Sequence, residues 1–203
     1  MPLWLVGAFL VTALLYSSVG FGGGSTYTAL LVFSGLQISL VPIVSLACNL
    51  AVTSSGTWRS HRAGLYDRSS VWPILVCSVP SAFLGGLTPI SEASLVLLLG
   101  VSLLFASIQL AWTTFGRATS PEDPQRWRSR WIAPVIGTGI GYLSGLVGIG
   151  GGIFLAPILH IIGWDSPRRI AALATAYIAA NSVAGLAGKL IAHAGSESLM
   201  SVI

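Results

Sequence analysis

Two glycine-rich stretches hold the residues that are best suited to chemistry. The first reads SSVGFGGGSTYTAL (residues 17–30), and the second reads GLVGIGGGIFLAPIL (residues 145–159). A helix that starts after such glycines presents unpaired backbone N–H groups and a partial positive charge, which together suit an anion. Glycine also lets the backbone approach a ligand closely and adopt positive φ. The two stretches therefore predict anion binding by backbone donors.

Small polar side chains follow each glycine-rich stretch. They lie in SLACNLAVTSSGTW (residues 45–58) and LATAYIAANSVAGL (residues 173–186), two otherwise apolar segments. Such side chains either hydrogen-bond a neighbouring helix or line a substrate path, and glycines can equally serve close helix packing. Both interpretations stay open for each residue. The predicted substrate-binding set is Gly22, Gly23, Gly24, Ser25, Asn49, Gly150, Gly151, Gly152 and Asn181.

Several other chemistries lack the residues that they need. The stretch GFGGGSTY has no lysine in the phosphate-loop position and no strand before it, so a nucleotide site is excluded. Cys48 and Cys77 are the only cysteines, and both lie in apolar runs, which favours neither a disulfide framework nor a zinc site. No Ser/His/Asp or paired-carboxylate pattern indicates a hydrolase. We expect no enzymatic activity, no cofactor and no metal.

Residues that could form a proton relay are also scarce in the apolar segments. No aspartate or glutamate lies in the middle of an apolar segment, so a dedicated carboxylate relay is not predicted. His160 lies in a short apolar segment and is one candidate for proton coupling, with packing as the alternative reading. The protonation of the substrate itself is another route.

The composition is that of an integral membrane protein. The chain has 203 residues, of which 54% are hydrophobic and only 8% are charged, and its mean hydropathy is +0.83. Soluble domains carry about 25% charged residues, so this chain cannot cover an ordinary water-facing surface. The net charge of +4 comes from cations in short loops between apolar runs. That placement follows the positive-inside rule and is no indication of nucleic-acid binding.

Eight apolar segments are long and continuous without period-2 alternation, which predicts helices and not barrel strands. Two of them, Ser25–Leu36 and Ile153–Ile162, are too short to cross a hydrocarbon core of about 30 Å. We expect each to belong to a glycine-broken helix, either a re-entrant hairpin or one discontinuous crossing. The other six segments are Pro2–Val19, Ser39–Gly56, Ser70–Leu87, Ala93–Trp112, Ile132–Val147 and Ile170–Ile191.

The two stretches align at a constant offset of 128, with Gly22–Gly24 over Gly150–Gly152 and Gly35 over Gly163. An internal duplication follows. We expect residues 1–115 to form a first transmembrane repeat, 116–131 a cytoplasmic polar loop, and 132–203 a second repeat that looks truncated at its C-terminus. With re-entrant hairpins, the two repeats are inverted relative to each other, an architecture of secondary transporters with a midplane site.

The two units resemble the signature units of the sulfite exporter TauE/SafE family, also called the 4-toluene sulfonate uptake permease family. The resemblance is carried by GFGGGSTYTALLVFSGL and by GLVGIGGGIFLAPILHIIGW followed by SPRRIAALATAY, and it extends over essentially the whole chain. It implies a carrier of small sulfur-containing or organic anions in a bacterial-type inner membrane.

The expected function is therefore secondary transport of a small anion, such as sulfite, a sulfonate or thiosulfate, by alternating access. The expected location is the inner membrane, in several passes, and the expected partners are a small anion, the bilayer and a second copy of the chain in a homodimer. A non-transporting membrane scaffold and an anion channel are the alternatives.

Overall fold

The computed structural model describes residues 3–19, 22–115 and 132–200, and all the secondary structure in these ranges is α-helical. This confirms the predicted all-α class for the described part of the chain. The predicted polar loop 116–131 lies outside the described residues. The helices are α1 (Leu3–Val19), α2 (Gly24–Phe33), α3 (Val41–Arg62), α4 (Arg68–Leu87), α5 (Glu92–Phe115), α6 (Ile132–Val147), α7 (Gly152–Ile161) and α8 (Pro167–Met200).

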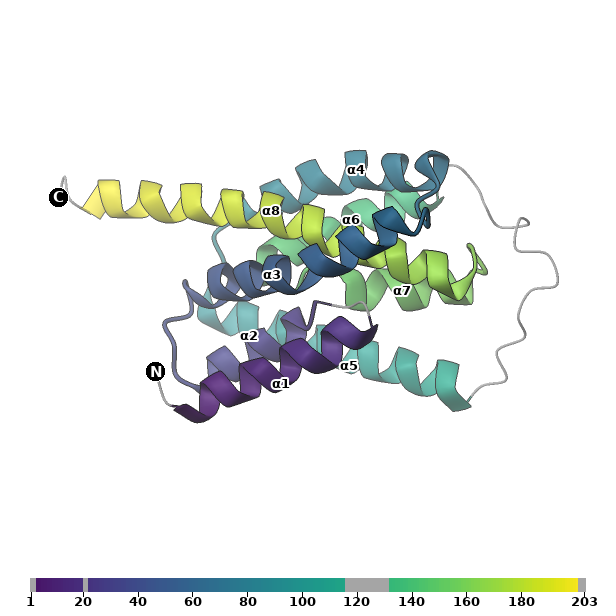
Figure 1. Ribbon diagram of the computed structural model, residues 1–203. Helices are drawn as coiled ribbons and strands as arrows, with labels where there is room; N and C mark the ends of the chain where they lie inside the picture. The colour runs from purple at the N-terminus through teal and green to yellow at the C-terminus, as the bar shows by residue number, and fades with distance from the viewer. Residues whose placement is uncertain (1–2, 20–21, 116–131, 201–203) are drawn as a thin grey trace.

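Helix α3 connects the parts of the bundle. It packs on α1 and α2 on one side and on α8 on the other, while α4 packs on both α6 and α8 (Figure 1). The ends of α3 follow from local sequence. Pro42 stands at its start, where a missing N–H does no harm, and Gly64 with φ of 65° follows its last turn.

A row of glycines brings α6 against α4. Gly137, Gly141 and Gly145 recur every four residues on α6 and face Ile74, Ser78 and Ala82 of α4. A Cβ at Gly145 would overlap the Ala82 carbonyl oxygen. Small residues at this spacing let helix backbones touch, as is common between membrane helices.

Helices α4 and α8 meet in the same way near the end of α4. A Cβ at Gly86 would lie 2.5 Å from the Gly185 carbonyl oxygen, and one at Gly188 would lie 3.0 Å from the Cα of Gly86. We call the residues of these two contacts the glycine seam: Gly86, Gly137, Gly141, Gly145, Gly185 and Gly188. The seam makes α4, α6 and α8 a tightly packed unit.

Large apolar side chains cover much of the outer surface. Leu14 of α1 and Leu97 of α5 are 63% and 67% exposed. Exposed apolar surface of this kind marks a protein or membrane contact. Among the described residues, Pro167–Ala194 is long and apolar enough to cross a membrane alone, and six other apolar helical segments have 10 to 17 residues.

The predicted short helices are present. Helices α2 and α7 have 10 residues each, and their bounds differ by the same offset of 128. Ten residues span about 15 Å, half of a hydrocarbon core. Both helices end sooner than the segments Ser25–Leu36 and Ile153–Ile162 suggested, because the last residues of each segment form a turn closed by a glycine. That glycine is Gly35 with φ of 73° or Gly163 with φ of 61°.

The backbone hydrogen bonds of the two units correspond one to one. The amides of Thr26 and Tyr27 bond to the Gly23 carbonyl, as those of Phe154 and Leu155 bond to the Gly151 carbonyl. At the other end, Leu36 bonds to Leu31 at 3.3 Å, and Trp164 bonds to Leu159 at 2.9 Å. The two units therefore share one local fold. The inverted relation of the repeats, the re-entrant path and the domain boundaries stay predictions.

Candidate functional site

The two glycine units meet at the starts of α2 and α7. A Cβ at Gly24 would overlap the carbonyl oxygen of Ile149, which belongs to the second unit. A Cβ at Gly148 would lie 2.6 Å from the Cα of Pro42 on α3. Glycine is required here because backbone from distant parts of the chain comes into direct contact.

Ser45 of α3 joins the two units by hydrogen bonds. Its side chain is fully buried, and its hydroxyl lies 2.8 Å from the Gly148 carbonyl oxygen and 3.0 Å from the Gly24 carbonyl oxygen. It also accepts a hydrogen bond from the Thr28 hydroxyl at 2.9 Å. One turn of α3 thus holds the glycine loops of both units.

Asn49 lies one turn further along α3, between the same loops. A Cβ at Gly22 would lie 2.6 Å from Asn49 Oδ1, and one at Gly150 would lie 2.9 Å from Asn49 Nδ2. The side chain is fully buried, and within the described residues neither polar atom of its amide has a hydrogen-bond partner. A buried unpaired polar group costs about 1–3 kcal/mol, so an amide left in this state calls for a ligand, ion or water.

The helix starts add backbone donors to this amide. Gly23 and Gly151 are the N-caps of α2 and α7, both in the left-handed conformation, with φ of 74° and 76°. Because both N-caps are glycine, no N-cap side chain accepts a hydrogen bond from the first N–H groups of either helix. The first N–H groups of a helix have no partner inside the helix and carry its partial positive charge. The arrangement offers hydrogen-bond donors and positive potential to an anion.

The other predicted polar residues, Ser25 and Asn181, have different surroundings. Ser25 is buried in the first turn of α2, beside the loops. Asn181 is also fully buried with both amide atoms unpartnered in the described structure, but it lies one turn beyond Tyr177. The Tyr177 hydroxyl donates to the Gly137 carbonyl, on the glycine seam. Of the two amides, Asn49 is the one found among the nearest neighbours of the loop glycines.

Sequence reasoning missed three residues that the structure brings to this site: Ser45, Thr28 and Ile178. Ser45 could have been found, because it precedes Asn49 by four residues and so shares its helix face. Ile178 gave no signal, since an isoleucine in an apolar helix is ordinary. His160 is exposed, and its Nδ1 pairs with the Ala156 carbonyl one turn back at 2.8 Å, which leaves it outside the site.

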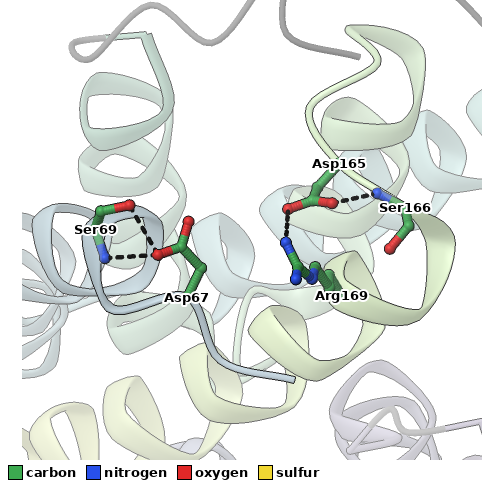
Figure 2. A network of polar contacts seen from close by, with 5 residues as sticks. All are labelled: Asp67, Ser69, Asp165, Ser166 and Arg169. Carbon is green, nitrogen blue, oxygen red and sulfur yellow. Dashed lines mark hydrogen bonds and ion pairs between the residues drawn. The ribbon is translucent and has the colours of Figure 1, made fainter. Parts of the chain in front are cut away.

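A polar network stands at the loops before α4 and α8 (Figure 2). Asp67 is the N-cap of α4 and accepts hydrogen bonds from the Ser69 amide at 3.0 Å and hydroxyl at 2.8 Å. Asp165 accepts from the Ser166 amide at 2.6 Å and pairs with Arg169 at 3.6 Å. These contacts stabilise the starts of two helices, a structural function.

A cavity of about 580 Å³ opens next to the Asp67 loop. Its lining includes His61, Tyr66, Trp72 and Ala176. Burial raises the pKa of Tyr66, whose hydroxyl donates to the Thr57 carbonyl at 3.3 Å. The glycine loops do not contribute to this lining. In the described residues no group of three or more His, Cys, Asp or Glu side chains is placed to hold a metal ion.

Comparison with known proteins identifies the family. The sequence profile of the sulfite exporter TauE/SafE family matches residues 5–202. The chain belongs to the TauE/SafE family. It is also 33% identical over 185 residues to a Sinorhizobium fredii protein described as "probable membrane transporter protein y4hK", an alignment that covers 89% of this chain and 73% of the relative. No solved structure matches the chain.

Membership in the TauE/SafE family confirms the resemblance of the paired glycine units and makes the chain a membrane transporter and not an enzyme. It also agrees with the apolar outer surface of the bundle. A transporter implies a substrate and a membrane, but the family assignment leaves the identity of both open.

Proposed function

We propose that this chain is a secondary transporter of the inner membrane that moves a small anion, such as sulfite, a sulfonate or thiosulfate, by alternating access. The anion binds where α2 and α7 begin. Gly22, Gly23, Gly24 and Ser25 of the first unit and Gly150, Gly151 and Gly152 of the second surround it, and Asn49 supplies a side-chain donor.

The unpaired amide of Asn49 is the observation that carries this proposal. It is fully buried, lies against glycines of both units, and has no partner among the described residues. An anion that accepts a hydrogen bond from Nδ2, together with backbone N–H groups, removes the cost of that unpaired donor. A carboxylate-free and lysine-free site of this kind binds its anion with neutral donors, which lets the anion leave again.

Alternating access fits the duplicated local fold. In transporters built from inverted repeats, the halves of the bundle rock around a site at their interface, and broken helices point their N-termini at anionic groups. The contacts of Gly24 with Ile149 and of Ser45 with Gly148 join the two glycine units and support such an interface. We include the inverted arrangement and the re-entrant path of both units in the proposal. Asn181 contributes packing next to Tyr177 in place of substrate contact.

The test compares Asn49→Leu with the matched control Asn181→Leu. Both replace a fully buried, unpartnered amide by an apolar side chain of similar volume. In the purified protein, sulfite, methanesulfonate and thiosulfate are expected to raise the thermal unfolding temperature of the wild type and of Asn181→Leu, because a ligand that binds the folded state stabilises it. We expect Asn49→Leu to lose this response and, in proteoliposomes, at least 90% of the flux.

Three outcomes would contradict the proposal. Equal anion stabilisation in Asn49→Leu and wild type would remove Asn49 from the site. If no anion changes the unfolding temperature of the wild type, the result favours a scaffold in which the glycines serve packing alone. Flux that does not saturate and shows no counterflow would favour a channel.

A further inference from the structure

Ile178 of α8 occupies the same contact region as Asn49. A Cβ at Gly150 would lie 2.8 Å from the Ile178 Cγ2 atom, and one at Gly22 would lie 3.0 Å from it. A Cβ at Gly152 would overlap Cδ1 and Cγ1 of the same side chain. Ile178 is 2% exposed. It therefore touches glycines of both units and is enclosed between them.

Gly22 and Gly150 each contact both Asn49 and Ile178. One polar side chain from α3 and one apolar side chain from α8 thus share the same two glycines. Asn49 brings a donor and an acceptor, whereas Ile178 brings neither. An anion held at these glycines meets a hydrogen-bonding amide and a hydrocarbon wall, and the wall limits the space for any part of the anion that points away from the donors.

The shape of the wall is stable. A β-branched side chain in a helix has one strongly preferred χ1 rotamer, so isoleucine cannot swing aside as methionine or leucine can. Its neighbours on α8 support it, because Ala174 and Tyr177 are also fully buried. A larger ligand cannot gain room by rotating Ile178 at low cost.

We infer that Ile178 determines the substrate size of this transporter: it admits anions whose non-coordinating end is small and rejects those that carry a longer alkyl chain. The inference rests on the proposed function, because it concerns the same anion site. It adds a specificity-determining residue whose effect is separate from the donor contacts of Asn49.

The expected effect follows from the volume removed. One methylene more or less in an apolar pocket changes discrimination by roughly 10- to 200-fold. Ile178→Val removes one methylene, and Ile178→Ala removes three carbon atoms. We expect the ratio of butanesulfonate flux to sulfite flux to rise roughly tenfold or more in Ile178→Val and further in Ile178→Ala. Sulfite flux itself should change much less.

Ile170→Val and Ile170→Ala are the matched controls. Ile170 is on the same helix, two turns earlier, and is 1% exposed in the hydrophobic core. The same atoms are removed from an equally buried isoleucine that does not contact the glycine loops. Both pairs of variants should lower the unfolding temperature, but only the Ile178 pair should change the flux ratio. Reconstituted flux is measured for sulfite, methanesulfonate, ethanesulfonate and butanesulfonate.

The outcomes separate this inference from the proposed function. If the wild type transports sulfite and the Ile178 variants keep the wild-type ratio of butanesulfonate flux to sulfite flux, the inference is overturned and the proposed function stands. Equal changes of the ratio in the Ile178 and Ile170 variants would also overturn it, since the effect would then be general loosening of the core. A wild type that moves none of the four anions would overturn the proposed function first and this inference with it.

Discussion

The two glycine units have the same backbone conformation, but the side chains that follow the glycines are polar in the first unit and apolar in the second. In the first unit, Ser25 and Thr26 follow the first glycine of α2, and the Thr26 and Thr28 hydroxyls form hydrogen bonds with Tyr16 of α1 and Ser45 of α3. In the second, Ile153 and Phe154 follow the first glycine of α7, which packs into the hydrophobic core. The same contrast holds in the long helices that follow, where Asn49 corresponds to Tyr177 at the offset of 128.

This difference teaches how a duplicated fold acquires one site. The paired helix starts need only glycine in the left-handed conformation, and both units keep it. The polar side chains at the meeting point come from the first half, while Ile178 comes from the second. Under the proposed function, the backbone would supply the binding geometry in both units, and the side chains at the meeting point would supply the selectivity.

The largest effect is expected at Gly24. A Cβ at Gly24 would overlap the Ile149 carbonyl, whereas a Cβ at Gly152, its counterpart, would overlap only the end of the Ile178 side chain. We expect Gly24→Ala to destabilise the protein by about 3 kcal/mol or more, because the clash is with backbone, and Gly152→Ala by about 1–2 kcal/mol, within the usual range for overpacking against one apolar side chain. Thermal unfolding in detergent measures both. Equal losses would mean that the two units are equivalent after all.

A medium effect is expected at Ser45. Its counterpart at the offset of 128 is Leu173, which makes no hydrogen bond through its side chain. Ser45→Ala leaves the Gly148 carbonyl without that donor, and a lost partner for a buried group costs about 1–3 kcal/mol. Urea unfolding of Ser45→Ala, with exposed Ser107→Ala as the control, checks the value. A loss below about 0.5 kcal/mol, the size of an ordinary surface substitution, would show that Ser45 does not tie the units together.

The smallest effect is expected at Tyr177. Tyr177→Phe removes the hydrogen bond from its hydroxyl to the Gly137 carbonyl, a change of about 1 kcal/mol. Because this bond belongs to the glycine seam, we expect sulfite to stabilise Tyr177→Phe as strongly as it stabilises the wild type. A thermal-shift titration with sulfite measures this. An altered sulfite midpoint would extend the anion site to Tyr177.

Much of this fold could be predicted from the sequence. The repeated glycines, the fixed offset and the length of the apolar runs predicted two short helices behind paired loops, because glycine and segment length act locally. The seam could not be predicted in the same way. The spacing of Gly137, Gly141 and Gly145 predicts close helix packing. Which helix packs against them depends on the arrangement of the whole bundle.

The site was predicted in part for the same reason. The glycines and Asn49 were expected together, and the structure places them in contact. Asn181 looked equivalent to Asn49 in composition, yet it corresponds to Thr53 at the offset of 128, one helical turn after the position that corresponds to Asn49. A shift of one helical turn is invisible in composition, and under the proposed function it separates the two amides.

The position of Ser45 has a consequence for motion. A serine hydroxyl has one proton, but Ser45 lies within 3.0 Å of two carbonyl oxygens, one in each unit. If the units separate during transport, as the proposed alternating access requires, the Ser45 hydroxyl that loses the Gly148 carbonyl can donate to the Gly24 carbonyl instead. Ser45 then keeps a hydrogen bond throughout the movement, and the Gly148 carbonyl is the group that needs a new donor.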